Sequence, residues 1–166
     1  MAALASMSTN PQLLNRCVAV GQSFREDWYA GIFCFRFWRF GHWEEVVVDD
    51  WLPVQSGGQP LFIHSGRPNE FWPALLEKAY AKLNGSYEAL ASTLIGDAMD
   101  DICGGLTESF SLTVSDANEF ASKLPPDLDD ILIKSFDRHS LITARIRVSY
   151  LKCYLYFLVI RYIFDI

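Results

Sequence analysis

The segment from residue 32 to residue 48 constrains the fold of this chain more than any other. Residues 32–40 form a β-rich run whose aromatic and aliphatic side chains fall at both odd and even positions. Apolar side chains on both faces are typical of a strand that is covered on both sides. Gly41-His42 indicates a turn, and residues 43–48 form a second β-rich run. We therefore predict a buried antiparallel hairpin.

A helix is predicted downstream of the hairpin, beginning after Asn69, whose side chain is a typical helix N-cap. Apolar side chains recur there every four residues, which is the pattern of an amphipathic helix. They are Phe71, Leu75, Ala79 and Leu83. Pro73 is tolerated because it falls in the first turn, and Gly85 is a typical residue for ending the helix.

Shorter elements complete the predicted fold. Two short helices are expected at the start, over residues 2–7 and from Asn10-Pro11 to Cys17. The remaining predictions, in chain order, are a strand over 61–63, a helix over 97–103 closed by Gly104-Gly105, a strand over 106–114, helices over 116–122 and 127–138, and a strand over 141–148. Helices and antiparallel strands in this order indicate an α+β fold.

Composition limits the classes of partner. A chain of 166 residues with 51% hydrophobic content fits one domain with a sizeable core. The formal net charge is −6, so the chain has no broad positive field to attract phosphate backbones, and we expect no nucleic-acid partner. Calcium or basic partners are more compatible with this charge.

The cysteines indicate a reducing compartment. They are widely spaced, with no CxxC pair and no Cys/His cluster at zinc spacing. Their positions are Cys17, Cys34, Cys103 and Cys153. The first residues are apolar but lack the basic region of a secretory signal, so we interpret them as a helix and expect a cytoplasmic protein.

Residues 150–166 differ from the rest in being rich in tyrosine, leucine, isoleucine and phenylalanine. Lys152, Arg161 and Asp165 interrupt them, and the longest uncharged run, from Cys153 to Ile160, is far shorter than the roughly 20 residues of a membrane span. A membrane-spanning helix is therefore not expected. Two alternatives stay open: a core strand, or a segment that does not belong to the fold of the rest.

Five sequence segments, in the same order along the chain, resemble the protease core of the calpains, which are calcium-dependent intracellular cysteine endopeptidases. They lie at residues 29–33, 46–50, 71–72, 76–82 and 104–108. The resemblance covers residues 2–142 and corresponds to the first of the two subdomains of a papain-like core. It implies a short antiparallel sheet with surrounding helices. It also divides the chain into a partial catalytic domain over 1–148 and a divergent hydrophobic tail over 149–166.

The same resemblance implies that the chain holds no catalytic residue. In calpains the nucleophilic cysteine lies in a Gly-Asp-Cys-Trp phrase at the start of a helix, and residues 2–6 resemble the continuation of that helix. The nucleophile would then fall before Met1. The histidine and asparagine of the triad belong to the second subdomain, and the likeness fades after residues 140–142. A chain truncated in this way at both ends is expected to be inactive by itself.

No cysteine inside the chain is expected to replace the nucleophile. Burial in an apolar strand would make Cys34 inert. Gly104 and Gly105 would leave Cys103 accessible, but the end of a helix and the adjacent Asp100 and Asp101 oppose a thiolate. No spacing pairs a cysteine with a histidine; the histidines are His42, His64 and His139.

Glu70 is the one candidate metal ligand. In calpains a glutamate in the matching Asn-Glu-Phe-Trp phrase helps to bind calcium, so the resemblance implies a calcium site that includes Glu70. Calcium takes six to eight oxygen ligands, and a single carboxylate with Asn69 and nearby carbonyls would hold it weakly. The alternative is that Glu70 only favours the start of the following helix electrostatically.

Two further positions bear on function. Calpains carry a Gly-Gly pair where the substrate backbone approaches, and residues 91–93 here are Ala-Ser-Thr, which implies altered substrate handling. Asp49 and Asp50 resemble a metal pair, but at the end of a strand they are more often hydrogen-bonded turn residues.

Three functional hypotheses follow. The first is an incomplete piece of a calpain-type endopeptidase that performs calcium-dependent limited proteolysis, whose partners would be protein substrates or the missing second core subdomain. The second is a non-catalytic calpain-like binding or regulatory module, because half of a core would expose an apolar face. The third is a fragment attached to a membrane by residues 150–166, against which the charges in that segment argue.

Overall fold

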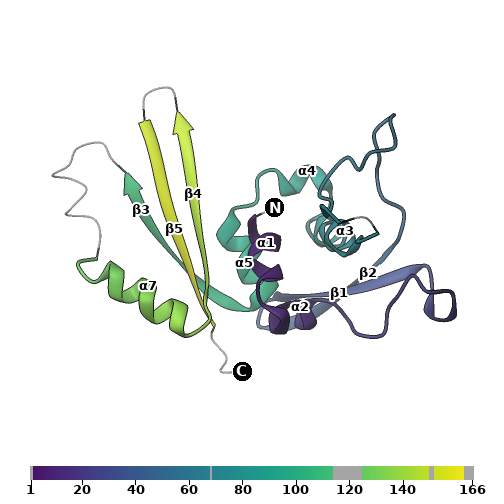
Figure 1. The fold of residues 1–166 in the computed structure, drawn as a ribbon, viewed down its shortest axis with the longest axis horizontal. Coiled ribbons are helices and arrows are strands. Elements are labelled where there is room, and N and C mark those ends of the chain that lie inside the picture. Colours follow the sequence, from purple (N-terminus) through teal and green to yellow (C-terminus); the bar gives the residue numbers. More distant parts are fainter. Residues whose placement is uncertain (1, 68, 114–124, 150–151, 163–166) are drawn as a thin grey trace.

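A computed structural model describes residues 2–67, 69–113, 125–149 and 152–162. Two sheets organise these residues (Figure 1): a hairpin that lies beneath most of the helices, and a three-stranded sheet flanked by one helix. This is the α+β architecture that the sequence predicts, with a short antiparallel sheet and surrounding helices.

The chain opens with two short helices, as predicted. They are α1 (Ala2–Ser8) and α2 (Pro11–Cys17). The Asn10 side chain accepts hydrogen bonds from the backbone N–H groups of Gln12 at 3.1 Å and Leu13 at 3.3 Å. These bonds satisfy donors that have no partner inside the helix, and they explain why α2 begins at Pro11.

The predicted hairpin is confirmed. Strands β1 (Ile32–Arg39) and β2 (His42–Asp49) pair antiparallel, with Ile32 opposite Asp49 and Arg39 opposite His42. Burial differs between the two faces: Phe33, Phe35 and Phe37 are buried, whereas on the other face Cys34 and Trp38 are partly buried and Ile32 is 54% exposed. The expectation of cover on both faces therefore holds only in part. Helices α3 and α5 lie on one side of the two strands (Figure 1), and both contact β1.

Helix α3 (Trp72–Asn84) begins later than the sequence predicts and ends where predicted, before Gly85. Asn69 is not its N-cap. Asn69 has a positive φ of 64°, and Phe71 occupies the capping position without a side-chain hydrogen bond. Pro73 fits the first turn because its missing N–H would have no helical partner there.

Two helices follow α3: α4 (Tyr87–Leu90) and α5 (Ile95–Cys103). The predicted helix over 97–103 is confirmed, and Gly104 ends it in the left-handed conformation. The strand predicted over residues 61–63 is wrong. The N–H of Ile63 donates instead to the Glu77 carboxylate of α3 at 2.9 Å, which satisfies this backbone group without a strand partner.

The second sheet consists of β3 (Gly105–Thr113), β4 (Leu141–Ser149) and β5 (Lys152–Tyr162), and α7 (Leu128–Asp137) lies beside it. The strands predicted over 106–114 and 141–148 are thereby confirmed for their described residues, as is the helix over 127–138. The helix predicted over 116–122 lies outside the described residues. Strand β5 lies between β3 and β4 and is antiparallel to both. Residues 152–162 of the last segment therefore form a strand, and its place in or outside the ancestral fold stays a prediction.

One apolar core joins the hairpin to the helices above it. Its fully buried side chains come from α1, α2, β1, α3 and α5, and the largest are Met7, Leu13, Phe35, Phe37, Leu75, Leu76 and Met99. Among the described residues, no helix is long and apolar enough to cross a lipid bilayer.

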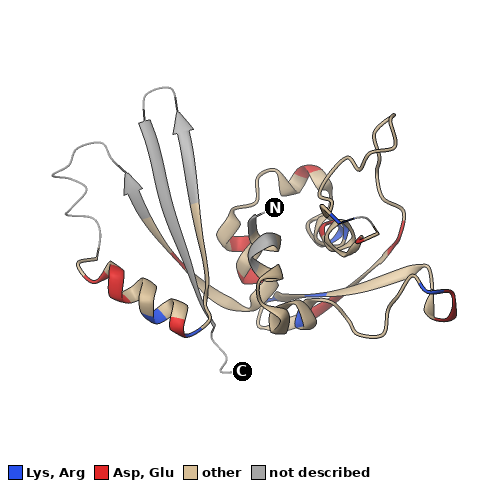
Figure 2. Cartoon of the chain, viewed as in Figure 1, with Lys and Arg blue, Asp and Glu red and all other residues tan. Residues whose placement is uncertain are grey.

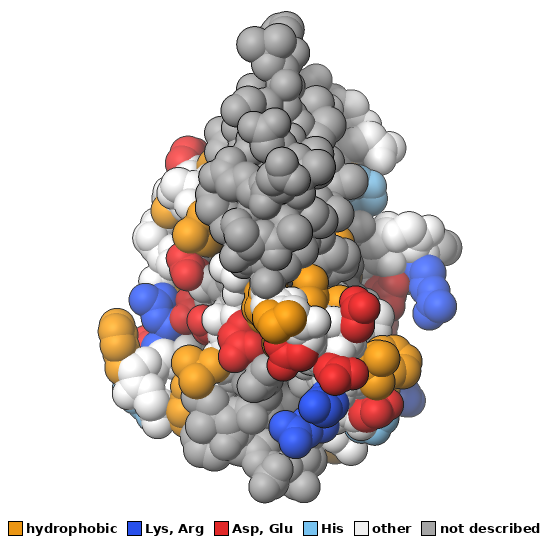
Figure 3. Space-filling view, turned by 90° about the vertical axis from the view of Figure 1, so that its left-hand side faces the viewer, with side chains coloured by type: hydrophobic (Ala, Val, Ile, Leu, Met, Phe, Trp, Pro, Cys, Tyr) orange, Lys and Arg blue, Asp and Glu red, His pale blue; other side chains and the backbone are white. Residues whose placement is uncertain are grey.

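Charged residues of one or both signs occur on most of these elements (Figure 2). Carboxylates are concentrated on α5, which carries Asp97, Asp100 and Asp101, and on the first turn of α7, which carries Asp129 and Asp130. On the face formed by α7, hydrophobic side chains lie among carboxylates (Figure 3). Ile133 and Phe136 are 59% and 74% exposed on this helix.

Candidate functional site

Glu70, the predicted metal ligand, lies just before α3. Its carboxylate accepts a hydrogen bond from the Trp72 indole N–H at 3.1 Å and another from the Ser65 hydroxyl. The pKa of Glu70 is lowered, first by the Ser65 hydrogen bond, then by that of Trp72, and also by the positive charge of Arg67. The Glu70 carboxylate is therefore ionised at neutral pH, and the two hydrogen bonds hold it in one orientation.

The oxygen donors at Glu70 suit a hard cation, and an ionised carboxylate keeps lone pairs free after accepting two hydrogen bonds. Within the described residues, however, no group of three or more His, Cys, Asp or Glu side chains could share a metal ion. Glu70 is thus one carboxylate where calcium needs several oxygen ligands. The calcium role of Glu70 stays a prediction.

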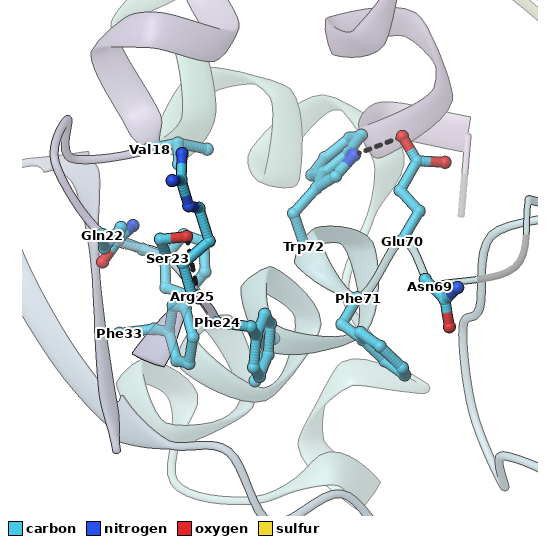
Figure 4. Close-up of a pocket in the computed structure, with 12 residues that line it drawn as sticks. Val18, Gln22, Ser23, Phe24, Arg25, Phe33, Asn69, Glu70, Phe71 and Trp72 are labelled. Carbon is cyan, nitrogen blue, oxygen red and sulfur yellow. Dashed lines mark hydrogen bonds between the residues drawn. The ribbon is translucent and has the colours of Figure 1, made fainter. Parts of the chain in front are cut away.

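A pocket of about 480 Å³ opens beside Glu70 (Figure 4). One wall comes from the segment between α2 and β1, which contributes Phe24 and Arg25; the other comes from the start of α3, which contributes Glu70, Phe71 and Trp72. The ring centroid of Phe24 lies 4.6 Å from that of Phe33 and 5.4 Å from that of Phe71. The resulting pocket has an aromatic floor with charged groups at its walls.

The segment that forms the first wall is held against β1 by Gln22. Its side-chain amide donates to the carbonyl of Cys34 at 2.9 Å, and its side-chain oxygen accepts from the N–H of Cys34 at 2.7 Å. This pair of hydrogen bonds replaces a strand partner at the edge of β1. Sequence reasoning missed Gln22, because no local pattern links it to a strand twelve residues away.

The thiols of Cys17 and Cys103 are buried and unsuited to nucleophilic attack. The sulfur of Cys17 donates to the carbonyl of Ile102 at 3.0 Å, and that of Cys103 to the carbonyl of Met99. Burial is the main cause that raises the pKa of each thiol to about 12. At neutral pH both are therefore almost entirely in the unreactive thiol form.

Cys103 corrects one expectation. The adjacent glycines were expected to leave it accessible, but it is only 2% exposed, because α5 packs on the hairpin and the Trp38 ring lies against Gly104. The pKa of Cys34 is also raised, first by burial and then by Glu45, although this thiol is only partly buried. The side chain of Cys153 lies outside the described residues.

Asp49 and Asp50 hold turns in place, as the structural interpretation of this pair predicts. Asp49 accepts from the N–H of Trp51 at 2.9 Å and from the ammonium group of Lys78, while Asp50 accepts from the Tyr29 hydroxyl. Lys78 also donates to the carbonyl of Trp51 at 2.6 Å. A lysine ammonium therefore pairs with the Asp49 carboxylate, while Asp50 is bound to a different partner.

Residues 91–93 follow α4, and two of their side chains return to that helix. The hydroxyl groups of Ser92 and Thr93 donate to the carbonyl of Ala89 at 3.0 and 3.4 Å. Side chains thus take up space in the stretch where the resemblance to calpains implies a glycine pair. Whether they alter substrate handling stays a prediction.

A half-buried polar cluster that sequence reasoning missed connects α3, α5 and β1. The Tyr80 hydroxyl donates to Asp101 at 2.9 Å, and the Arg39 guanidinium lies 3.7 Å from the same carboxylate. Burial is the main cause that raises the pKa of Asp101. The three residues are far apart in the sequence, so no spacing could have indicated their contact.

The α+β fold is consistent with the first core subdomain of a papain-like cysteine protease. Residues 1–154 match the family model described as calpain family cysteine protease. The chain is 48% identical over 149 residues to the calpain-1 catalytic subunits of Rattus norvegicus and Homo sapiens, and 45% identical to the calpain-2 catalytic subunit of Homo sapiens. Each comparison covers 90% of this chain.

The chain belongs to the calpain family of cysteine proteases. It spans about a fifth of the length of these relatives, namely 19% of the calpain-1 subunits and 20% of the calpain-2 subunit. The match to the family model continues through residue 154, into β5.

Proposed function

We propose that this chain is part of a calpain-type, calcium-dependent cysteine endopeptidase of the cytoplasm, and that the 166-residue polypeptide has no peptidase activity of its own. Family membership supports the first half of the proposal. The observation that carries the second half is the burial of Cys17 and Cys103, whose pKa values of about 12 oppose formation of a thiolate.

The partners follow from the same proposal. Peptide-bond hydrolysis would need a nucleophile, a base and a base-orienting residue supplied by other parts of a longer calpain chain, including a second core subdomain. Protein substrates would then bind in the completed enzyme. Glu70 would contribute one ionised carboxylate to a calcium site, with the remaining oxygen ligands coming from elsewhere.

The experiment measures casein hydrolysis by the purified 166-residue chain with millimolar calcium and a thiol reductant. A human calpain-1 catalytic subunit, assayed in parallel, is the positive control. We expect no hydrolysis above that of a chain in which all four cysteines are replaced by alanine. Calcium-dependent cleavage that requires any one of the four cysteines would overturn the proposal.

Calcium binding is measured separately by isothermal titration calorimetry on the parent chain and on Glu70→Gln. We expect weak binding by the parent, with a Kd near or above the millimolar range of open extracellular sites, and loss of that binding in the variant. Glu44→Gln removes an exposed carboxylate from β2 and is the matched control. Equal calcium affinity in Glu70→Gln and Glu44→Gln would remove Glu70 from the calcium proposal.

A second candidate function, a non-catalytic binding module, is favoured by one specific observation. Large aromatic side chains are exposed on the described surface, including Trp28 at 66%, Trp51 at 83%, and Phe24 and Phe71 at just under half. Exposed apolar patches often mark sites of interaction. This role requires no catalytic residue and is compatible with an inactive polypeptide.

A further inference from the structure

Helix α7 exposes two large apolar side chains one turn apart. Ile133 is 59% and Phe136 is 74% exposed, and residues three positions apart lie on one face of a helix. The other face of α7 packs against β4 and β5, and on it Ser135 is buried, with its hydroxyl donating to the carbonyl of Ile131 at 2.6 Å. The helix thus turns a serine towards the sheet and a phenylalanine towards solvent. Packing of the described residues does not account for the two exposed side chains.

Carboxylates lie beside these two side chains (Figure 3). Asp129 and Asp130 are in the first turn of α7, Asp137 is its last residue, and all three are exposed. With 3.6 residues per turn, each lies within about 60° of Ile133 around the helix axis. The helix has one cation, Lys134, so its three carboxylates leave it with a net charge of −2.

The helix itself accounts for only part of this charge. Its N-terminus favours the carboxylates of Asp129 and Asp130 electrostatically, but its C-terminus opposes that of Asp137. No ion pair among the described residues includes any of the three. Nor, in the same part of the chain, do three or more His, Cys, Asp or Glu side chains come together in a way that could hold a metal ion. A cationic group on another molecule is therefore the partner that suits these carboxylates.

The combination of charge and apolar surface selects one kind of partner. A second copy of α7 would bring carboxylates against carboxylates, and the phosphates of nucleic acids or anionic lipids would be repelled in the same way. A small cation by itself would leave Ile133 and Phe136 exposed to water. The complement of an apolar stripe flanked by carboxylates is a helix with an apolar stripe flanked by lysine or arginine, because flanking charges set partner choice when two helices pack.

We propose that the exposed face of α7 binds a basic amphipathic helix of a partner protein. The apolar side chains of that helix cover Ile133 and Phe136, and its lysine or arginine side chains lie beside Asp129, Asp130 and Asp137. With 10 residues α7 is about 15 Å long, so the contact is small and the binding weak and reversible.

This surface is separate from the candidate calcium site. Helix α7 lies beside the second sheet, on the opposite side of the molecule from α3 (Figure 1), whereas Glu70 lies just before α3. Binding at α7 therefore requires neither calcium nor peptidase activity, and it does not depend on the function proposed above.

The test measures the fluorescence anisotropy of labelled helical peptides mixed with the 166-residue chain in EDTA. The first peptide has leucines on one face with lysines beside them, the second has glutamates in place of the lysines, and the third has alanines in place of the leucines. We expect the first to bind at least tenfold more tightly than either of the others, and to bind more weakly as salt is added, because salt screens the charges. Equal binding of the first two peptides, or no binding of the first at millimolar concentration, would overturn the proposal.

Apolar variants locate the site. Ile133→Ala combined with Phe136→Ala should weaken binding of the first peptide at least tenfold. Trp51→Ala removes an apolar side chain that is 83% exposed elsewhere and is the matched control, which should bind as the parent does. Circular dichroism checks folding, and Phe136→Ala alone replaces the pair if the double variant unfolds, with at least a threefold loss expected. The same loss in Trp51→Ala would show that the peptide binds exposed apolar side chains without regard to place.

Charge variants test the flanking carboxylates. Asp130→Asn combined with Asp137→Asn should weaken binding at least threefold and make it less sensitive to salt. Glu26→Gln combined with Asp27→Asn removes two exposed carboxylates from the turn before β1 and should change neither. Equal effects of the two pairs would show that only the net charge of the chain matters and would refute the assignment to α7. Binding of the chain to phosphatidylcholine vesicles, lost in the Ile133 and Phe136 variant, would assign these side chains to a lipid surface and refute it as well.

Discussion

Gly104 illustrates how a single residue depends on both backbone and packing. It joins α5 to β3 with a φ of +69°, a conformation that side chains with a Cβ rarely adopt. A Cβ at this position would lie 3.1 Å from two atoms of the Trp38 ring. Glycine is therefore required twice, once by the left-handed turn and once by the aromatic ring that covers it.

We predict that Gly104→Ala lowers the free energy of unfolding more than Gly58→Ala does. Gly58 has a similar φ of +79°, but a Cβ added there would meet no atom within 4 Å. The stability lost in Gly58→Ala therefore reports only the cost of placing alanine in the left-handed conformation. That cost is about 1 to 2 kcal/mol. Crowding against Trp38 should add roughly 1 to 3 kcal/mol at Gly104. Urea unfolding followed by tryptophan fluorescence measures both values; equal losses would show that the ring moves aside without cost.

Asp100 should make stability depend on pH. Burial is the main cause that raises its pKa, with Asp97 and Asp101 contributing, while the Thr107 hydrogen bond acts in the opposite direction. The folded chain therefore holds this proton more tightly than the unfolded chain does. Its stability should fall as pH rises from the ordinary Asp pKa of about 3.9 through the raised folded pKa.

Asp100→Asn removes this contribution. We expect the variant to gain stability relative to the parent as pH rises through that window, measured by thermal unfolding at a series of pH values. Asp137→Asn, on the exposed surface of α7, is the matched control for loss of one carboxylate. If both variants differ from the parent by the same amount at every pH, burial of Asp100 is not the cause.

At the scale of elements, the turn between β1 and β2 carries an unfavourable residue. Phe40 and Gly41 have φ values of 50° and 85°, the signs required at both central positions of a type I′ turn. Asparagine and glycine suit these positions, whereas phenylalanine is strained there. Phe40 is 89% exposed, so core packing does not offset the strain.

We predict that Phe40→Asn is more stable than Phe40→Ala by about 0.5 to 1 kcal/mol, since asparagine tolerates the left-handed region better. Both variants lose the contact of the Arg39 guanidinium with the Phe40 ring, at 5.3 Å from its centroid, so this loss cancels in the comparison. Chemical denaturation of the two variants gives the difference directly. An alanine variant as stable as the asparagine one would show that the turn relaxes to another conformation.

At the scale of the whole molecule, the last strand supports the second sheet. Strand β5 separates β3 from β4, and every pairing of those two strands within the sheet is made to β5. The hairpin is a separate two-stranded sheet, and β5 pairs with β3 and β4 but not with β1 or β2. The two sheets should therefore differ in their dependence on residues 150–166.

We predict that a chain ending at residue 149 loses the second sheet and keeps the hairpin core. Hydrogen exchange followed by mass spectrometry should show loss of protection in β3 and β4, because their backbone groups lose their partners, and retained protection in β1 and β2. The full chain is the control. Unchanged protection of β3 would mean that residues 150–166 do not support the second sheet.

Much of the fold could be predicted because its signals are local. The Asn10 cap, the Gly41 turn, and the helix ends at Gly85 and Gly104 each depend on a few neighbouring residues, and all four are confirmed. The Asn69 cap is wrong, because Asn69 has a positive φ and α3 begins only at Trp72. The strand over 61–63 is wrong, because the N–H of Ile63 donates to the Glu77 carboxylate and not to a strand partner.

The candidate site was predictable only in part. Glu70 followed from the resemblance to calpains, but its hydrogen-bond donors, Ser65 and Trp72, depend on how the preceding loop folds back towards α3. Nothing in the sequence indicated that Arg25 would lie across a pocket from Glu70. Contacts of this kind join separate segments, and their spacing in the chain carries no periodic signal.

The sequence by itself determined the α+β class, most of the helices and strands, and membership of the calpain family, because side-chain periodicity, capping residues and family phrases are all local properties of the chain. Only the tertiary structure decided that Cys103 is buried, that the hairpin is buried on one face and only partly covered on the other, and that β5 is a central strand. These features depend on which distant surfaces pack together, and burial is a property of that packing and not of any single segment.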